Sequence, residues 1–206
     1  MYTAKDLQVK VIAKKTADSV VKLHHYSGKV CQNSQISFGV FIGDILIGAL
    51  QYGPSIDKRR TSGTLKCKMN EYLELNRMAL APSAPKNSES RVIAITLRIL
   101  RKQYPYLKCI LSFADGCQCG DGTIYRASGF MLIDYKKNNA LLGDENGEIH
   151  FNHGTKEKAA ARFKPLKGLQ FKYVYFFDDE LKKQFSNISI DSIPEEFRIY
   201  KGSFRA

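Results

Sequence analysis

The distribution of apolar and polar residues along the first part of the chain predicts two kinds of regular element. Residues 7–11 alternate with the two-residue period of a β-strand, and residues 16–23 read as a short helix. Two further alternating runs, 38–42 and 45–49, are separated by a Gly-Asp pair, which is the pattern of a β-hairpin. The chain is therefore expected to begin with a strand, a helix and a hairpin.

A third strand and a long helix follow. The alternation of this strand shifts by one residue between Arg77 and Met78, and such a shift is typical of a β-bulge. Residues 88–104 instead repeat their apolar side chains every three to four positions, as an amphipathic helix does. Either Asn87 or Ser88 is expected to cap its first turn.

A short apolar run with polar ends, residues 108–113, is typical of a central strand that is covered on both faces. Asp115 is expected just past the carboxyl end of this strand. In open α/β sheets ligands bind at that edge, because the loops that follow the strands are free to carry chemistry. Asp115 is therefore a candidate functional residue.

The remaining elements are shorter, and the sequence shows neither internal repeats nor a low-complexity linker. They are a helix at 122–128, strands at 130–135 and 173–177, and a turn at 144–147. We expect one mixed α/β (α+β) domain over residues 1–206, with a core at about 5–178 and a weakly patterned tail at 179–206.

Composition and charge narrow the function. Hydrophobic residues make up 44% of the chain and charged residues 25%, as in a folded protein rather than a disordered tail. The 32 Lys and Arg against 20 Asp and Glu give a net charge of +12, which favours a nucleic-acid partner over a merely soluble basic protein. The candidate phosphate contacts lie in a stretch expected to be an exposed loop and in a second basic segment: Lys58, Arg59, Arg60, Lys66 and Lys68, then residues 156–167.

The cysteines and the apolar runs bear on location and on metals. No apolar run approaches the ~18 residues of a membrane span, and no signal-peptide pattern is present, so we expect a cytoplasmic protein without a membrane partner. Five cysteines, an odd number, indicate reduced thiols. Cys117 and Cys119, with His24 or His25, could hold iron or zinc; no metal is expected, because a lone C-x-C is far less specific than paired C-x-x-C motifs.

Six short motifs occur in the order of a known family and are scattered over about half of the chain. They are HHYSG at 24–28, GALQYGPS at 48–55, LELNRMAL at 73–80, PKNSESR at 85–91, SFADG at 112–116 and GTIYRASGF at 122–130. Together they resemble the Mom DNA-modification proteins of Mu-like phages, a divergent branch of the GNAT-type acyltransferases. The resemblance implies conversion of adenine in double-stranded DNA to a carbamoylmethyl-adenine, which protects phage DNA from host restriction inside the host cytoplasm.

The resemblance also implies a GNAT-like fold, with a central, mostly antiparallel bulged sheet flanked by helices. One departure concerns the donor. GNAT enzymes hold the pyrophosphate of coenzyme A on a glycine-rich turn before the long helix, whereas this chain has APKNSESR there, without glycine. Arg77, Ser88, Glu89 and Ser90 are the candidates for holding the donor. Ordinary helix capping and, for Arg77, an edge ion pair are the alternatives.

Both an acyl-CoA and a glycyl-tRNA remain open as the donor. A carbamoylmethyl group contains the atoms of a glycine residue, so transfer of an activated glycyl group followed by rearrangement gives the expected type of product without a redox step. A tRNA would then be a second nucleic-acid partner of this basic protein. The sequence leaves the oligomeric state open, a homodimer included.

The nucleophile implied by the resemblance is the exocyclic 6-amino group of adenine, whose lone pair is delocalised into the ring, so it needs a base or a polarised acceptor. Asp115 would orient or deprotonate this amine, and Tyr125 would return a proton to the leaving group. His25 and Tyr26 could serve as base, stacking wall or metal ligand. The structural alternatives are a turn cap for Asp115, a core phenol for Tyr125 and a structural pair for His25 and Tyr26.

Reaching this amine in a duplex requires the nucleotide to be flipped out, with aromatic rings replacing its stacking. Tyr26, Tyr52 and Phe113 are the candidates. Two rival functions remain: an ordinary GNAT-type N-acetyltransferase acting on a protein, a small amine or RNA, and a DNA-binding module without catalytic activity.

Overall fold

The computed structural model describes residues 2–138, 141–143, 149–151 and 163–198. The predicted turn at 144–147 and most of the basic segment at 156–167 lie outside the described residues. The chain divides into two compact units. Unit 1 comprises residues 1–112, 127–130 and 174–185, and unit 2 comprises residues 113–126, 131–173 and 186–206. The expectation of a single domain stays a prediction.

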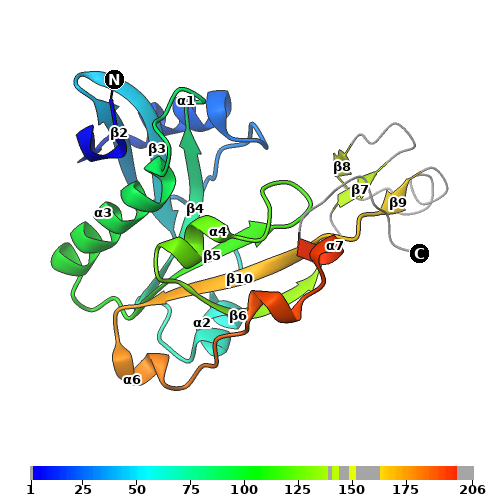
Figure 1. Cartoon of the computed structure of the whole chain (residues 1–206). Helices are drawn as coiled ribbons and strands as arrows, with labels where there is room; N and C mark the ends of the chain where they lie inside the picture. Colours follow the sequence, from blue (N-terminus) through cyan, green and yellow to red (C-terminus); the bar gives the residue numbers. More distant parts are fainter. Residues whose placement is uncertain (1, 139–140, 144–148, 152–162, 199–206) are drawn as a thin grey trace. The chain divides into compact units, whose positions relative to one another are not determined.

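The main sheet has seven strands and is mixed but mostly antiparallel, as predicted (Figure 1). In spatial order they are β1 (Leu7–Val11), β2 (Ile36–Ile42), β3 (Ile45–Gly53), β4 (Tyr72–Leu80), β5 (Cys109–Asp115), β10 (Leu169–Phe176) and β6 (Met131–Lys137). The strands from β1 to β4 pair antiparallel, and β5 joins β4 in parallel over three residue pairs. A separate small sheet has the order β8 (Ile149–Phe151), β7 (Leu141–Gly143) and β9 (Lys164–Pro165).

The three predicted helices are confirmed as α1 (Lys14–His24), α3 (Ser88–Gln103) and α4 (Thr123–Ala127), whereas α2 (Lys58–Leu65), α6 (Asp179–Lys182) and α7 (Glu195–Arg198) were not predicted. The short 3-10 helices are η1 (Ala4–Asp6) and η2 (Ile190–Ser192). The long helix begins after Asn87, as expected, but the side chain of Asn87 makes no capping hydrogen bond.

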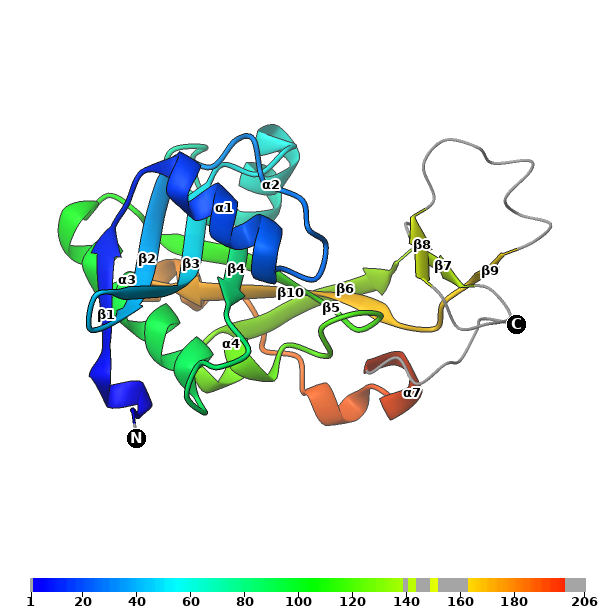
Figure 2. The ribbon, with the colours of Figure 1, turned by 90° about the horizontal axis from the view of Figure 1, so that it is seen from above.

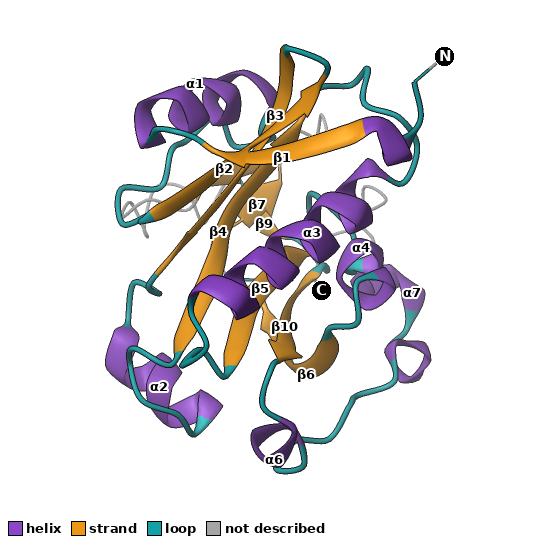
Figure 3. Cartoon of the chain, turned by 90° about the vertical axis from the view of Figure 1, so that its left-hand side faces the viewer, coloured by secondary structure: helices purple, strands orange, loops and turns teal. Residues whose placement is uncertain are grey.

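In unit 1, α1 and α3 cover opposite faces of the strands (Figures 2 and 3). Neighbouring residues of β3 show this, because successive side chains of a strand point to opposite faces. The amide of Gln51 donates to Asp18 of α1 over 2.8 Å, and the hydroxyl of Tyr52 lies 2.6 Å from that of Thr96 of α3. The sheet of unit 1 is therefore covered by a helix on each side.

The predicted bulge in β4 is confirmed, one residue before the expected position. Gln51 pairs with Arg77, whereas the next residue, Tyr52, pairs with Leu75. Asn76 is therefore the extra residue, and its side chain is buried. Beside it, Gly53 leaves no room for a side chain, since a Cβ there would lie 2.4 Å from the carbonyl oxygen of Asn33.

The prediction of a loop at residues 58–68 is wrong in its first part, which is the helix α2. The carboxylate of Asp57 caps this helix by accepting from the backbone N–H of Arg60. The polar stretch shows no apolar period because Leu65 is the buried residue of α2. Lys66, at φ +53°, ends the helix. The expected exposure of Lys58, Arg59 and Arg60 is confirmed.

Two glycine-to-alanine variants should change the stability in opposite directions. Gly53→Ala should destabilise the protein, because the new Cβ would meet backbone atoms of Asn33 and Ser34 at 2.4 and 2.9 Å. Gly63→Ala should stabilise it by about 0.5–1 kcal/mol, because this position lies in α2 with open space around it and alanine favours the helix. Urea unfolding of both variants checks this; equal stability of the two would contradict the close packing at Gly53.

Candidate functional site

His25 is held in one protonation state by its neighbours. It follows the last turn of α1, and its Nδ1 accepts the backbone N–H of Ser27 over 3.1 Å. The hydroxyl of Ser27 lies 2.8 Å from the same atom. Burial, and then the charge of Arg77, lower the pKa of His25 to about 4. An Nδ1 that accepts an N–H carries no proton, so neutral His25 carries its proton on Nε2 and is a hydrogen-bond donor there.

Tyr26 lies beside this histidine. The two rings are 4.2 Å apart between centroids and inclined by 31°. Tyr26 is 58% exposed. The predicted His-Tyr pair is therefore a stacked pair with its tyrosine open to solvent, which suits a stacking wall.

Arg77, on the bulged strand, anchors the connection between α1 and β2. Its Nε donates to the carbonyl of Lys29 over 2.9 Å, and its Nη1 donates to the carbonyl of Asn76 over 2.6 Å. Ser34 donates to the side chain of Asn76 over 3.3 Å. The bulge thus contacts this connection near its middle, at Lys29, and near its end at β2, at Ser34.

A cavity of about 720 Å³ lies at this connection in unit 1. It is lined by residues 30–35 from the connection, by residues 54–56, and by Lys58 and Arg77. Within this lining, the hydroxyl of Ser55 donates over 2.7 Å to Glu74, and burial raises the pKa of this glutamate. The sequence reading missed Glu74 and the Asn33–Ser34 pair, because isolated polar residues in a strand and a loop carry no motif.

Asp115 is the last residue of β5 rather than the residue past its end. Its Oδ1 accepts the backbone N–H of Cys117 over 2.9 Å, and its Oδ2 accepts the amide of Asn138 over 2.8 Å. Burial raises the pKa of this carboxyl group. The turn-cap role predicted as an alternative is therefore present. It does not exclude a second role, because each carboxylate oxygen can accept two hydrogen bonds.

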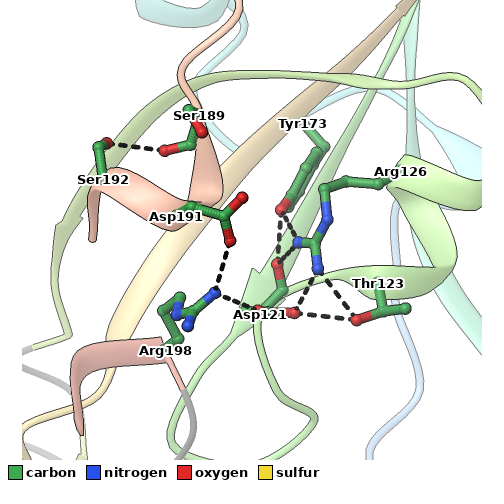
Figure 4. Close-up of polar contacts among 8 residues, drawn as sticks. All are labelled: Asp121, Thr123, Arg126, Tyr173, Ser189, Asp191, Ser192 and Arg198. Carbon is green, nitrogen blue, oxygen red and sulfur yellow. Dashed lines mark hydrogen bonds and ion pairs between the residues drawn. The ribbon is translucent and has the colours of Figure 1, made fainter. Parts of the chain in front are cut away.

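Tyr125, on α4 in unit 2, is 8% exposed and packs against Tyr173, with ring centroids 5.5 Å apart. Tyr173 donates its hydroxyl hydrogen to the carbonyl of Asp121, and Arg126 donates to the Tyr173 oxygen over 2.8 Å (Figure 4). The position of Tyr125 is thus supported by a tyrosine whose own hydroxyl is fixed. The packing agrees with the core role that was the alternative for Tyr125.

The buried carboxylate of Asp121 is the centre of this network (Figure 4). It pairs with Arg126 at 3.0 Å and with Arg198 at 3.9 Å, and accepts the hydroxyl of Thr123 over 3.0 Å. Arg198 also lies 3.6 Å from the exposed Asp191. The network joins the loop before α4 to α7. The motif at 122–130 contains Thr123 and Arg126 but did not indicate their contacts with Asp121.

The residues expected to hold a donor at the start of α3 are partly engaged within the protein. Ser88 is buried and donates to the carbonyl of Pro85, and Ser90 lies 3.4 Å from the carbonyl of Asn87. Glu89 adds a negative charge to the same turn. Asn87 adopts φ +66°, a conformation that favours glycine.

The remaining candidates differ in accessibility. Tyr52 is fully buried and its hydroxyl lies beside that of Thr96, so its ring offers no face for stacking on a base and this assignment is corrected. Phe113 is half-buried, whereas Lys66 and Lys68 are exposed. The prediction of an accessible ring failed because Tyr52 precedes a Gly-Pro pair, which is typical of the end of a strand, although the residue lies inside the covered sheet.

The sulfur candidates lie in unit 2. Cys117 is buried, and Cys119 is exposed and accepts the backbone N–H of Asp115 over 3.2 Å. Within the described ranges, no group of three or more His, Cys, Asp or Glu side chains could hold a metal ion. No helix in that part of the chain is long and apolar enough to cross a membrane.

Comparisons with known proteins decide the family. A model of the Mom protein family matches residues 6–195. The chain belongs to the Mom family. It is 33% identical over 201 residues to the methylcarbamoylase mom of Escherichia phage Mu, covering 89% of this chain and 80% of that protein. The family resemblance carried by the six motifs is thereby confirmed.

Solved structures confirm the GNAT-like α/β fold. The chain resembles the polyamine N-acetyltransferase of Drosophila melanogaster with a TM-score of 0.52 and 10% identity, over 84% of this chain and 100% of that chain. It also resembles a GNAT family acetyltransferase from Elizabethkingia anophelis with acetyl-CoA bound, with a TM-score of 0.50 and 14% identity, over 84% and 99% of the two chains. At these identities the likeness shows the fold alone.

The lowered pKa of His25 makes the stability depend on pH. In the unfolded chain a histidine titrates near 6.5, whereas His25 in the folded protein titrates at about 4. Between these values the unfolded state binds more protons, so the free energy of unfolding should fall as the pH drops from 6.5 to 4. His25→Gln should remove this part of the fall in urea unfolding. An NMR titration showing His25 protonated near pH 6.5 would contradict the assignment.

Loss of the Asp121 carboxylate should lower the stability of the folded protein. Asp121→Ala leaves Arg126 and Arg198 without their shared buried partner and should destabilise the protein by about 3 kcal/mol or more. Asp191→Ala is the matched control; it removes an exposed carboxylate from Arg198 and should leave the stability almost unchanged. Thermal unfolding of both variants measures the difference, and equal losses would show that burial of Asp121 is not the cause.

Proposed function

We propose that this chain modifies adenine in double-stranded DNA, converting it to a carbamoylmethyl-adenine at the exocyclic 6-amino group. The observation that carries the proposal is its membership of the Mom family, with 33% identity to the Mu methylcarbamoylase over 89% of this chain. A phage that encodes such an enzyme would protect its DNA from restriction in the host cytoplasm.

In this proposal Asp115 orients or deprotonates the 6-amino group of adenine. Its hydrogen bonds from Cys117 and Asn138 fix the orientation of the carboxylate, and each of its oxygens has a further acceptor site. Burial raises its pKa, and a more basic carboxylate is a better proton acceptor near neutral pH. Tyr125 would donate a proton to the leaving group, with its ring oriented by Tyr173.

His25 receives a different role from that of a base. Its Nδ1 is engaged by Ser27 and its pKa of about 4 keeps the ring neutral, so the group it offers is the Nε2–H donor. Such a donor would polarise a carbonyl of the donor molecule or bind a ring nitrogen of adenine. The exposed ring of Tyr26 supports a stacking contact with a base.

The activated donor is proposed to be a glycyl or acyl group, with Arg77 contacting a phosphate of the molecule that carries it. The start of α3 is a poor cradle for a pyrophosphate. Ser88 is buried and donates to Pro85, and Glu89 is an anion in the first turn. No step is therefore assigned to coenzyme A, and glycyl-tRNA is the favoured donor. Growth with isotope-labelled glycine tests it: mass-spectrometric fragmentation that finds no label in the carbamoylmethyl group, as distinct from the purine ring, would exclude a glycyl donor.

The exposed cations Lys58, Arg59 and Arg60 on α2, with Lys66 and Lys68 after it, support contacts with DNA phosphates. If they bind the backbone, the affinity for duplex DNA should fall steeply as the salt concentration rises. A shallow dependence on salt would remove these residues from the proposed interface.

The proposal is tested by mass spectrometry of nucleosides from plasmid DNA of cells that express the wild-type protein or Asp115→Asn. We expect an adenosine heavier by the carbamoylmethyl group with the wild-type protein, and a reduction of about 10²-fold or more with the variant, because the amide cannot accept the proton. The variant keeps the size of the side chain, and circular dichroism checks its fold.

Unmodified DNA from the wild-type protein, together with acetylation of amines supplied with acetyl-CoA, would favour the ordinary N-acetyltransferase. Modified DNA from both proteins would keep the function and remove the role of Asp115.

A further inference from the structure

An isoleucine is fully open to solvent in the loop before α2. Ile56 is 98% exposed, more than any other of the exposed large apolar residues in the described ranges. A single exposed apolar side chain is ordinary in itself. Three features around Ile56 are not: a loop fixed on both sides of it, a cluster of cations directly after it, and a cavity that it lines.

The loop that carries Ile56 is held on both sides. Before it, Pro54 accepts a hydrogen bond from the side chain of Asn33, and Ser55 is buried and donates to Glu74 over 2.7 Å. After it, Asp57 accepts the N–H of Arg60 over 3.0 Å. Ile56 therefore projects from an ordered turn, and its side chain can be removed without loss of packing.

The charges next to Ile56 favour one class of partner. Lys58, Arg59 and Arg60 form the exposed first turn of α2. The positive end of the helix dipole lies at the same turn. Duplex DNA carries a phosphate charge every ~1.7 Å along its axis, so an apolar tip followed by three cations matches a groove bordered by phosphates. Proteins that distort DNA insert isoleucine, leucine or methionine side chains between base pairs in this way.

A recess of the surface lies directly beside Ile56. Ile56 lines the cavity of about 720 Å³ together with Pro54, Ser55 and Arg77. This volume lies in the range of ~300–1,000 Å³ that is usual for small-molecule sites. The isoleucine and the recess are thus neighbours in unit 1.

We propose that Ile56 is the wedge that opens the double helix. It inserts between base pairs in the space left by the displaced adenine, and Lys58, Arg59 and Arg60 bind phosphates beside this gap. This inference rests on the proposed function, because it explains how the amine of a paired adenine becomes accessible.

The test measures base opening without any donor. Duplexes that carry 2-aminopurine in place of adenine, in every combination of flanking bases, are mixed with the protein, and the rise in fluorescence reports unstacking. The wild-type protein should raise the fluorescence of at least one duplex. Ile56→Ala should bind the duplex with similar affinity, measured by fluorescence anisotropy. Its fluorescence rise should be about tenfold smaller than that of wild type, because no side chain fills the gap between the base pairs.

Two variants control for the change itself. Ile45→Ala removes the same side chain from another exposed position, 67% exposed at the start of β3, and should behave as wild type. Ile56→Met keeps a long apolar side chain and should retain the fluorescence rise. The yield of modified adenine in plasmid DNA should follow the same order, with Ile56→Ala about tenfold below the other three proteins.

The outcomes separate this inference from the proposed function. A fluorescence rise with Ile56→Ala equal to that of wild type, or wild-type binding without any rise, would overturn the wedge and leave adenine modification standing. A rise that depends on Ile56 in a protein that modifies no adenine would support the wedge and overturn the proposed function.

Discussion

The arrangement of unit 1 around its cavity depends on one irregularity in the sheet, the extra residue Asn76 in β4. Without this extra residue, the side chains of β4 on one side of the bulge would point to the other face of the sheet. With it, Asn76 accepts the hydroxyl of Ser34, and Arg77 donates to the carbonyl of Lys29. Two contacts from neighbouring residues thus fix a long connection that has little regular structure of its own.

The same bulge controls the loop that carries Ile56. Gly53 packs without a side chain against Asn33 and Asn76, so the end of β3 can approach the connection closely. This approach lets Asn33 donate to Pro54. The protonation of His25 follows as well, since Arg77 is one of the two causes of its lowered pKa. Arg77 therefore links the backbone geometry of the bulge to the protonation of His25.

Much of the fold could be predicted from the sequence, because strands and helices bury a periodic set of apolar residues. The bulge was visible as a break in the period at Arg77, and α3 as a regular stripe. The helix α2 was missed because a single buried residue, Leu65, gives no period, and its start depends on the cap Asp57. Tyr52 was misjudged because burial in a covered strand depends on residues distant in sequence.

The candidate site was less predictable, because its positions depend on side chains that meet only in the fold. The family motifs indicated Asp115 and Tyr125, but not what orients them. Asn138 lies far from Asp115 in the sequence, as Tyr173 and Arg198 do from Asp121, and the lengths of the segments between them carry no signal. A buried glutamate such as Glu74 resembles an ordinary polar position of a strand until its partner Ser55 is known.

The exposed isoleucine also has a consequence for how copies of this protein behave in solution. One apolar side chain is too small a patch to hold two copies together by itself, but it adds to their contact when they meet, and the net charge of +12 opposes this contact by repulsion between molecules. Salt or a polyanion weakens that repulsion. The protein is therefore expected to be most soluble at low ionic strength, and to crowd along DNA once phosphates have neutralised its charge.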